Sequence, residues 1–221
     1  MKKLITAIAI ISLSAISYAS AQIRVGTSVA WTNLDASGTE TIKDTSVKTT
    51  GSSSADVLIP ALFIEAGSED RGFYIGIDYT DVAALESKSR DDGNTDTVDT
   101  DRGEQTAAAD VESLMSIYAI KTLGDSGVFV KLGYAQADVI TKVQLTSGTT
   151  YNNASIDGIV IGAGIQKQDD SGYFFRVAAE YIDYDSISLT GSEAGGTSTS
   201  YNKITADVDS TAFKISIGKA F

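Results

Sequence analysis

The sequence has no histidine and no cysteine, and it has a single proline, Pro60, among 221 residues. Without histidine there is no imidazole general base, no serine–histidine triad and no histidine-bound zinc. Without cysteine there is no thiolate nucleophile, disulfide, iron–sulfur cluster or thioether lipid anchor. An enzyme built from this chain would have to work with carboxylates, Ser, Tyr or Lys. We therefore expect no enzymatic activity, no cofactor and no metal site.

Positive charge is scarce as well: 17 Lys and Arg residues stand against 29 Asp and Glu residues, which gives a net charge of -12. A surface of this sign repels phosphate backbones, so we expect no nucleic-acid partner. Long apolar runs are also missing. The longest covers about 13 residues, which falls short of the ~20 that a membrane-spanning helix needs.

That apolar run has the setting of a secretory signal peptide. It covers residues 4–16, follows two lysines, and precedes an Ala-Ser-Ala segment at 19–21. A positive start, an apolar centre and a small-residue cleavage site define such peptides, which are removed on export. We expect residues 1–21 to be a signal peptide and residues 22–221 to form one domain in a bacterial cell envelope.

Apolar and polar residues alternate through most of the remaining chain, most clearly at 23–31, 73–79 and 213–218. A period of two puts alternate side chains on opposite faces, which predicts β-strands. Pro60 falls inside one of these segments, where its missing N–H would weaken pairing, so we expect a bulge or a strand start there. The sequence predicts eight strands, at about 22–33, 56–66, 73–85, 112–123, 128–139, 158–168, 173–184 and 206–221.

Short and long connections alternate strictly between these strands. Three are tight and rich in Gly, Asp and Ser, at 67–72, 124–127 and 169–172. The other four are long and polar, at 34–55, 86–111, 140–157 and 185–205. All short turns and both termini then lie at one end, as in bacterial outer-membrane barrels with short periplasmic turns and long extracellular loops. The expected fold is all-β, an eight-stranded antiparallel up-and-down transmembrane β-barrel.

Alternation alone does not say which face meets lipid, because a soluble lipocalin-like barrel that binds an apolar ligand shows the same pattern. The residues on the polar face favour a crowded lumen over a solvated surface, since most are small: Gly26, Ser28, Gly76, Gly133, Ala135, Gly162, Gly164, Ser216 and Gly218. Apolar-face aromatic residues gather near the strand ends, as at lipid interfaces. They are Trp31, Tyr79, Tyr118, Tyr134 and Tyr181 towards the long loops, and Phe73, Tyr173, Phe175 and Phe221 towards the short turns.

Charged residues on the small polar face predict a network that closes the lumen. The members are Asp78, Lys131, Arg176, Glu180 and Lys214. If Phe221 lies level with Gly172, antiparallel pairing puts Lys214 opposite Ala179 and within reach of Glu180. Asp78 would then form an ion pair with either Lys131 or Arg176. The alternative is a wet lumen in which these charges are solvated separately.

The acidic segment at 91–101 carries carboxylates two or three residues apart, a spacing that hard-cation sites share. An EF-hand loop beginning at Asp92 would need Gly at its sixth position and Glu at its twelfth, where this chain has Thr97 and Gly103. A solvated acidic loop is the preferred interpretation. Loose divalent-cation bridging to lipopolysaccharide would also suit such a loop.

The last strand has an apolar face and ends on an aromatic residue. That face carries Phe213, Ile215, Ile217 and Phe221, and only Lys219 departs from it. This strand resembles the terminal strand of outer-membrane barrels, in which a final Phe forms part of the signal for the barrel-assembly machinery. With the signal peptide and eight strands, the chain resembles the small eight-stranded outer-membrane barrel superfamily, which includes the OmpA transmembrane domain, OmpX and the opacity-type proteins.

The resemblance implies a monomer in the bacterial outer membrane, surrounded by lipid and lipopolysaccharide. It implies a structural, surface-interaction or limited solute-diffusion role, with a possible extracellular ligand held by the long loops. A general porin is not expected, because side chains can fill the interior of an eight-stranded barrel. A soluble envelope barrel with an apolar ligand stays open as the alternative.

Overall fold

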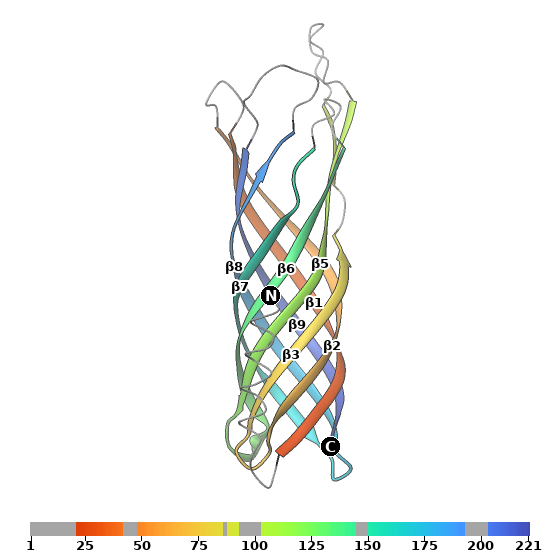
Figure 1. The fold of residues 1–221 in the computed structure, drawn as a ribbon, viewed down its shortest axis with the longest axis vertical. Helices are drawn as coiled ribbons and strands as arrows, with labels where there is room; N and C mark the ends of the chain where they lie inside the picture. Colours follow the sequence, from red (N-terminus) through yellow and green to blue (C-terminus); the bar gives the residue numbers. More distant parts are fainter. Residues whose placement is uncertain (1–20, 42–47, 86–87, 93–102, 145–149, 193–202) are drawn as a thin grey trace, which may run out of the picture.

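The computed structural model describes residues 21–41, 48–85, 88–92, 103–144, 150–192 and 203–221, and nearly all of them lie in strands (Figure 1). No helix in these ranges is long and apolar enough to cross a membrane. Residues 1–20 of the predicted signal peptide lie outside the described residues. The elements are β1 (Ala21–Thr41), β2 (Lys48–Ser68), β3 (Phe73–Ala84), β4 (Lys88–Asp92), β5 (Gly103–Thr122), the short 3-10 helix η1 (Gly124–Ser126), β6 (Val128–Gln144), β7 (Ala154–Gln168), β8 (Tyr173–Thr190) and β9 (Lys203–Ala220).

The strands form a closed antiparallel barrel. Pairing follows the order β3-β2-β1-β9-β8-β7-β6-β5, and β5 pairs with β3 to close the ring. β4 continues the position of β3, since both pair with β5, β3 along residues 110–121 and β4 along residues 103–107. The nine segments therefore fill eight strand positions. This confirms the predicted eight-stranded antiparallel up-and-down barrel.

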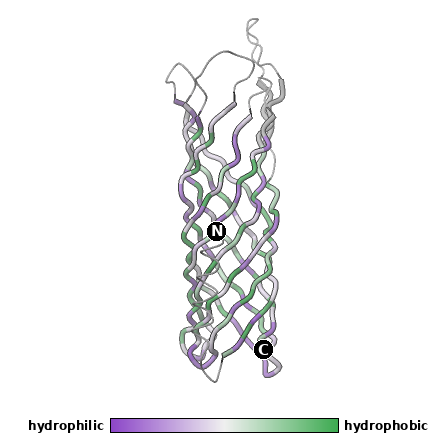
Figure 2. The backbone as a smooth tube through the Cα atoms, viewed as in Figure 1, coloured by the Kyte–Doolittle hydropathy of each residue, from purple (hydrophilic) through white to green (hydrophobic). Residues whose placement is uncertain are grey.

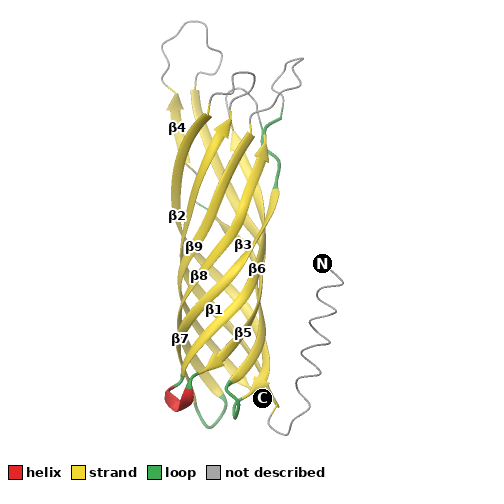
Figure 3. Ribbon diagram, turned by 90° about the vertical axis from the view of Figure 1, so that its left-hand side faces the viewer, coloured by secondary structure: helices red, strands yellow, loops and turns green. Residues whose placement is uncertain are grey.

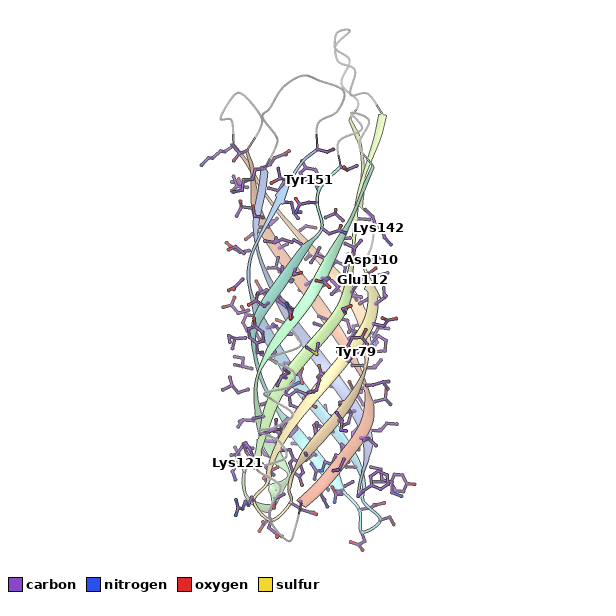
Figure 4. All side chains as sticks on the ribbon, in the orientation of Figure 1. Tyr79, Asp110, Glu112, Lys121, Lys142 and Tyr151 are labelled. Atoms are coloured by element: carbon purple, nitrogen blue, oxygen red, sulfur yellow. The ribbon has the colours of Figure 1, made fainter. Side chains whose placement is uncertain are left out.

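The two ends of the barrel differ, as the connection lengths predict. The three short connections, the start of β1 and the end of β9 lie together at what we call the turn end, and the opposite end is the loop end (Figure 3). Lys121 lies near the turn end, Tyr79 about halfway along the barrel, and Tyr151 near the loop end (Figure 4). We call the part from the turn end to the level of Tyr79 the turn half, and the remainder the loop half.

The strands are longer than predicted, and much of the segments expected to be long loops is strand. β1 continues to Thr41 and β2 begins at Lys48, with pairs such as Thr39 opposite Thr50 joining them. The same correction applies to 86–111, 140–157 and 185–205, into which β4, β5, β6, β7, β8 and β9 extend. Hydrophobic periodicity fades there because the outward positions become Ser, Thr and Asp, while backbone pairing continues.

The expectation of a bulge or strand start at Pro60 is wrong. Pro60 lies inside β2 in unbroken register with β1, where it is opposite Val29. On the other side of β2, the ladder to β3 ends at the pair of Leu62 and Tyr79, just before Pro60, which has no N–H to continue it. The hydroxyl of Thr80 donates to the Pro60 carbonyl at 2.7 Å.

The outer face of the turn half is apolar. Its strongly exposed side chains include Ile23, Val25, Val29, Leu62, Ile64, Ile161, Ile165, Ile215 and Ile217. Figure 2 shows polar and apolar residues alternating along these strands. Exposed aromatic residues border this band on both sides: Trp31, Tyr79, Tyr134 and Tyr181 at mid-barrel, and Phe73, Tyr173, Phe175 and Phe221 at the turn end. An aliphatic band between two aromatic girdles is the lipid-facing surface of a transmembrane barrel.

Polarity inverts in the loop half. Just beyond the mid-barrel aromatic residues, the outward positions become polar, mostly Asp: Asn33, Asp35, Asp56, Asp81, Asp157, Asp183 and Asp209. The inward positions become aliphatic, with Ile59, Val111, Leu114, Ile156 and Ile187 buried in one apolar cluster. Strand alternation is the same in both halves, but the turn half is apolar outside and the loop half is apolar inside.

Candidate functional site

Four of the predicted lumen charges meet in the turn half, and we call them the lumen quartet: Asp78, Lys131, Glu180 and Lys214. The Nζ of Lys131 lies 2.8 Å from Glu180 Oε1 and 3.4 Å from Asp78 Oδ2. The Nζ of Lys214 lies 2.7 Å from Asp78 Oδ2 and 3.7 Å from Glu180 Oε2. Each cation contacts both carboxylates, and all four side chains are at most 12% exposed. The quartet is therefore a closed, charge-neutral ring of ion pairs.

The register that led to part of this expectation is wrong by one residue. Lys214 pairs with Ala178, and Phe213 takes the predicted place opposite Ala179. The cause lies at the turn, where Ala220, rather than Phe221, donates its N–H to the Gly172 carbonyl at 2.8 Å. A one-residue shift moves a strand's side chains to the other face of the sheet. The observed register keeps Lys214 inward, so its side chain still reaches Glu180.

Of the two partners that the sequence left open for Asp78, Lys131 contacts it and Arg176 does not. Its guanidinium donates to both carboxylate oxygens of Glu65, at 2.7 Å from Nη1 to Oε1 and 2.9 Å from Nη2 to Oε2. The Tyr118 hydroxyl donates a third hydrogen bond to Glu65 Oε1 at 2.9 Å. The Glu65 side chain is fully buried. A two-point guanidinium–carboxylate contact of this kind fixes orientation as well as charge.

Arg24 forms a further layer nearer the turn end. Its guanidinium lies 3.6 Å from the centre of the Tyr74 ring, and its Nη2 donates to Gln168 Oε1 at 2.9 Å. Arg176 also lies over aromatic rings, between 5.3 and 5.8 Å from the centres of three Phe rings. Together these layers cross the lumen of the turn half. We call the set the lumen plug: Arg24, Phe63, Glu65, Tyr74, Asp78, Tyr118, Phe129, Lys131, Phe174, Arg176, Glu180 and Lys214.

Tyr118 corrects the predicted girdle, because it points into the lumen and is only 4% exposed. β5 is apolar on both faces here, with Ile117 and Ala119 outward and Ile120 inward. The alternation of the sequence therefore did not show which face of β5 points into the lumen. The small residues on the inner face make room for such rings. A Cβ added to Gly76 would lie 2.7 Å from the Tyr118 ring, and one added to Gly26 would lie 2.4 Å from the Phe63 ring.

Sequence reasoning missed Glu65 and Arg24, although a signal for both was present. Each is a single charged residue between apolar neighbours in a strand: Ile64 and Ala66 flank Glu65, and Ile23 and Val25 flank Arg24. In a strand whose apolar residues face lipid, a charged residue between two of them points into the barrel. Their partners were not visible from sequence, because they are distant along the chain.

The predicted assembly residues all lie on the outer face. Phe213, Ile215, Ile217 and Phe221 are between 38% and 70% exposed. Phe221 also helps to join β9 to β1, since its N–H donates to the Ile23 carbonyl at 2.8 Å. Lys219, which departed from the apolar pattern, has its Nζ 4.7 Å from the centre of the Tyr173 ring, so aromatic faces accommodate its charge at the turn end.

The acidic segment at 91–101 falls largely on residues 93–102, which lie outside the described residues. Its first residues, Asp91 and Asp92, are the last two residues of β4 and do not lie in a loop. Within the part of the chain that the structure describes, no group of three or more acidic side chains is arranged to hold a metal ion.

No family model and no curated protein sequence matches the chain. Among solved structures, the outer membrane protein OprG from Pseudomonas aeruginosa matches over 91% of this chain and 96% of its own, with a TM-score of 0.50 and 12% identity. The outer membrane protease OmpT from Escherichia coli matches over 90% and 97%, with a TM-score of 0.47 and 8% identity. Neisserial surface protein A matches over 90% and 97%, with a TM-score of 0.44 and 13% identity.

At 12% identity the likeness to OprG concerns the fold. The closed antiparallel ring and the alternation of short and long connections agree with that likeness. The chain therefore has the fold of the small eight-stranded β-barrels of bacterial outer membranes.

Proposed function

We propose that the chain is an exported protein of the bacterial outer membrane, with a structural or surface-interaction role and a lumen that is not an open pore. The observation that carries this proposal is the lumen plug, whose ion-paired and aromatic layers cross the lumen of the turn half. The apolar outer band and its two aromatic girdles support the membrane location. The likeness of the fold to that of the outer membrane protein OprG supports the same location.

In this proposal the turn half spans the membrane and the loop half projects from the cell. The acidic outer face of the loop half suits water and cation-bridged lipopolysaccharide headgroups better than acyl chains. In this proposal the apolar outer band of the turn half faces lipid, and the barrel acts as a monomer. Any extracellular ligand is held by the loop end, where the long connections lie.

Limited solute diffusion is the second candidate, and it requires the lumen plug to open. Planar-bilayer conductance distinguishes the two roles. We expect the wild type to be closed, and Glu180→Gln or Arg176→Ala to give larger or more frequent openings, because each leaves a buried charge without its partner. Tyr79→Phe keeps the plug intact and should behave as the wild type. Steady conductance by the wild type, unchanged in the variants, would contradict a closed lumen.

The proposed orientation predicts where proteases act on intact cells. Protease added outside should cleave within 86–111 or 185–205 and spare the three short turns, since only the loop end is exposed. Mass spectrometry of the fragments locates the sites, and permeabilised cells provide the control for turn-end access. Cleavage confined to Asp125–Ser126 or Asp170–Ser171 would reverse the topology.

The terminal residue predicts an effect on assembly. Deleting Phe221 removes the aromatic end of the apolar stripe and the backbone hydrogen bonds to Ile23, so the β1–β9 junction should close slowly and unfolded protein should accumulate in the periplasm. Heat-modifiable gel migration measures the folded fraction. Phe175→Ala removes an exposed Phe from another strand and serves as the matched control. Normal amounts of folded barrel after deletion would argue against recognition by the barrel-assembly machinery.

A further inference from the structure

The inverted polarity of the loop half encloses a cavity of about 570 Å³ inside the barrel. Its walls are mainly aliphatic side chains from all around the ring, among them Ile59, Val111, Leu114, Ile156 and Ile187. Its floor is formed by the lumen quartet through Asp78, Glu180 and Lys214. We call this space the loop-half cavity. Its volume falls within the range of roughly 300–1,000 Å³ that is typical of small-molecule sites.

The mouth of the loop-half cavity faces the loop end. Glu40 and Tyr151 line it from opposite parts of the ring, and the Tyr151 hydroxyl lies 3.3 Å from Glu40 Oε1. Tyr151 is near the loop end in Figure 4. The buried layers of the lumen plug lie on the other side of the floor. A molecule in the cavity therefore enters and leaves from the loop end.

The chemistry of the lining selects against charge. In the quartet each cation contacts both carboxylates, so the floor is neutral and its charges already have partners. Elsewhere the described walls offer mostly methyl groups. Tyr184 in this wall is buried, and burial raises its pKa to about 12. A charged molecule would lose its hydration here without gaining a counter-charge, whereas an apolar cavity of this kind takes up apolar molecules readily.

We propose that the loop-half cavity is a binding site for a small uncharged aliphatic molecule taken up from outside the cell. Flexible or alicyclic hydrocarbon groups fit its branched aliphatic walls, and a single hydroxyl can point to the polar mouth. The outer wall of this site is the acidic, water-facing surface of the loop half. Above its floor, the site thus lies beyond the lipid-facing band and is separate from the surrounding acyl chains.

The test uses the mature chain in lipid nanodiscs with isotope-labelled Ile, Leu and Val methyl groups. The probe is cyclohexanol, and its matched charged analogue is cyclohexanecarboxylate. We expect saturable NMR shifts at the methyl groups of Ile156, Ile187 and Val111, with the carboxylate binding weaker by about tenfold or more. Lipid-facing Ile215 and Ile217 report partitioning into the bilayer, so their shifts should rise linearly with concentration.

Two cavity-filling variants, Ala212→Phe and Ala61→Phe, should weaken cyclohexanol binding by about tenfold or more, because each ring occupies cavity volume. Ala179→Phe adds the same ring to the exposed outer face and should bind like the wild type. Heat-modifiable migration identifies which variants are folded. The proposal is overturned if the wild type shows no saturable shift, if the carboxylate binds equally well, or if a folded cavity-filling variant binds as the wild type does.

Discussion

Replacing Glu65 with alanine is expected to lower the free energy of unfolding of the barrel by about 3 to 5 kcal/mol. The fully buried carboxylate accepts two hydrogen bonds from Arg176 and one from Tyr118. Its removal leaves the Arg176 guanidinium in a confined interior without its counter-charge. Urea unfolding in lipid vesicles, followed by the fluorescence of Trp31, the single tryptophan, measures the change.

Two further variants separate the ion pair from a general effect of substitution. Glu69→Ala removes an exposed acidic residue at the turn end and should change stability little. The double variant Glu65→Leu with Arg176→Met removes both charges and should lose less stability than Glu65→Ala, since neither partner is left unpaired. If Glu65→Ala is as stable as Glu69→Ala, the Arg176–Glu65 pair does not hold the plug together.

The barrel itself could be predicted because its strongest determinants are local. Period-two alternation identified the turn half of every strand, and clusters of Gly, Asp and Ser identified the three short turns. Gly72, Gly127 and Gly172 in those turns all have positive φ, which glycine adopts without the strain of a side chain. Strict alternation of connection lengths then fixed the topology, as the closed ring confirms.

Strand length was not predictable by the same signal. Beyond Trp31 the outward residues of β1 are Asn33, Asp35 and Ser37, so apolar periodicity no longer identifies a strand. The backbone nevertheless continues in register with β2 and β9. The inward residues of this stretch include Leu34 and Ala36, which line the loop-half cavity. A pattern with its apolar face inside is the one that a soluble barrel shows.

The site could be predicted only in part, because its partners depend on register and on side-chain reach. The alternation of inward and outward positions along the strands placed four charged residues on one face, and the structure brings them together: Asp78, Lys131, Glu180 and Lys214. Arg176 has Glu65 as its partner, 111 residues away along the chain. Placing Phe221 instead of Ala220 level with Gly172 was enough to shift the predicted register of β9 against β8 by one residue.

The polarity inversion predicts that one substitution has very different effects at two heights of the same strand. Ile64 lies on the outer face of β2 in the turn half, opposite Ile77, and is 51% exposed, which in a membrane means contact with acyl chains. Ile64→Arg is expected to cost about 2 to 4 kcal/mol of stability, the value for Arg on a lipid-facing strand near the bilayer midplane. Urea unfolding in lipid vesicles measures the loss.

Ser52→Arg is the matched control, because Ser52 is also exposed on β2 but lies in the loop half, opposite Ser37 of β1. Its guanidinium would remain in water near outward Asp residues such as Asp35, so the expected cost there falls to roughly 0–1 kcal/mol. Equal costs at the two positions would show that the boundary at the mid-barrel aromatic residues does not coincide with the membrane surface. A large difference places that surface between Ile64 and Ser52, within the stretch of β2 that lines the loop-half cavity.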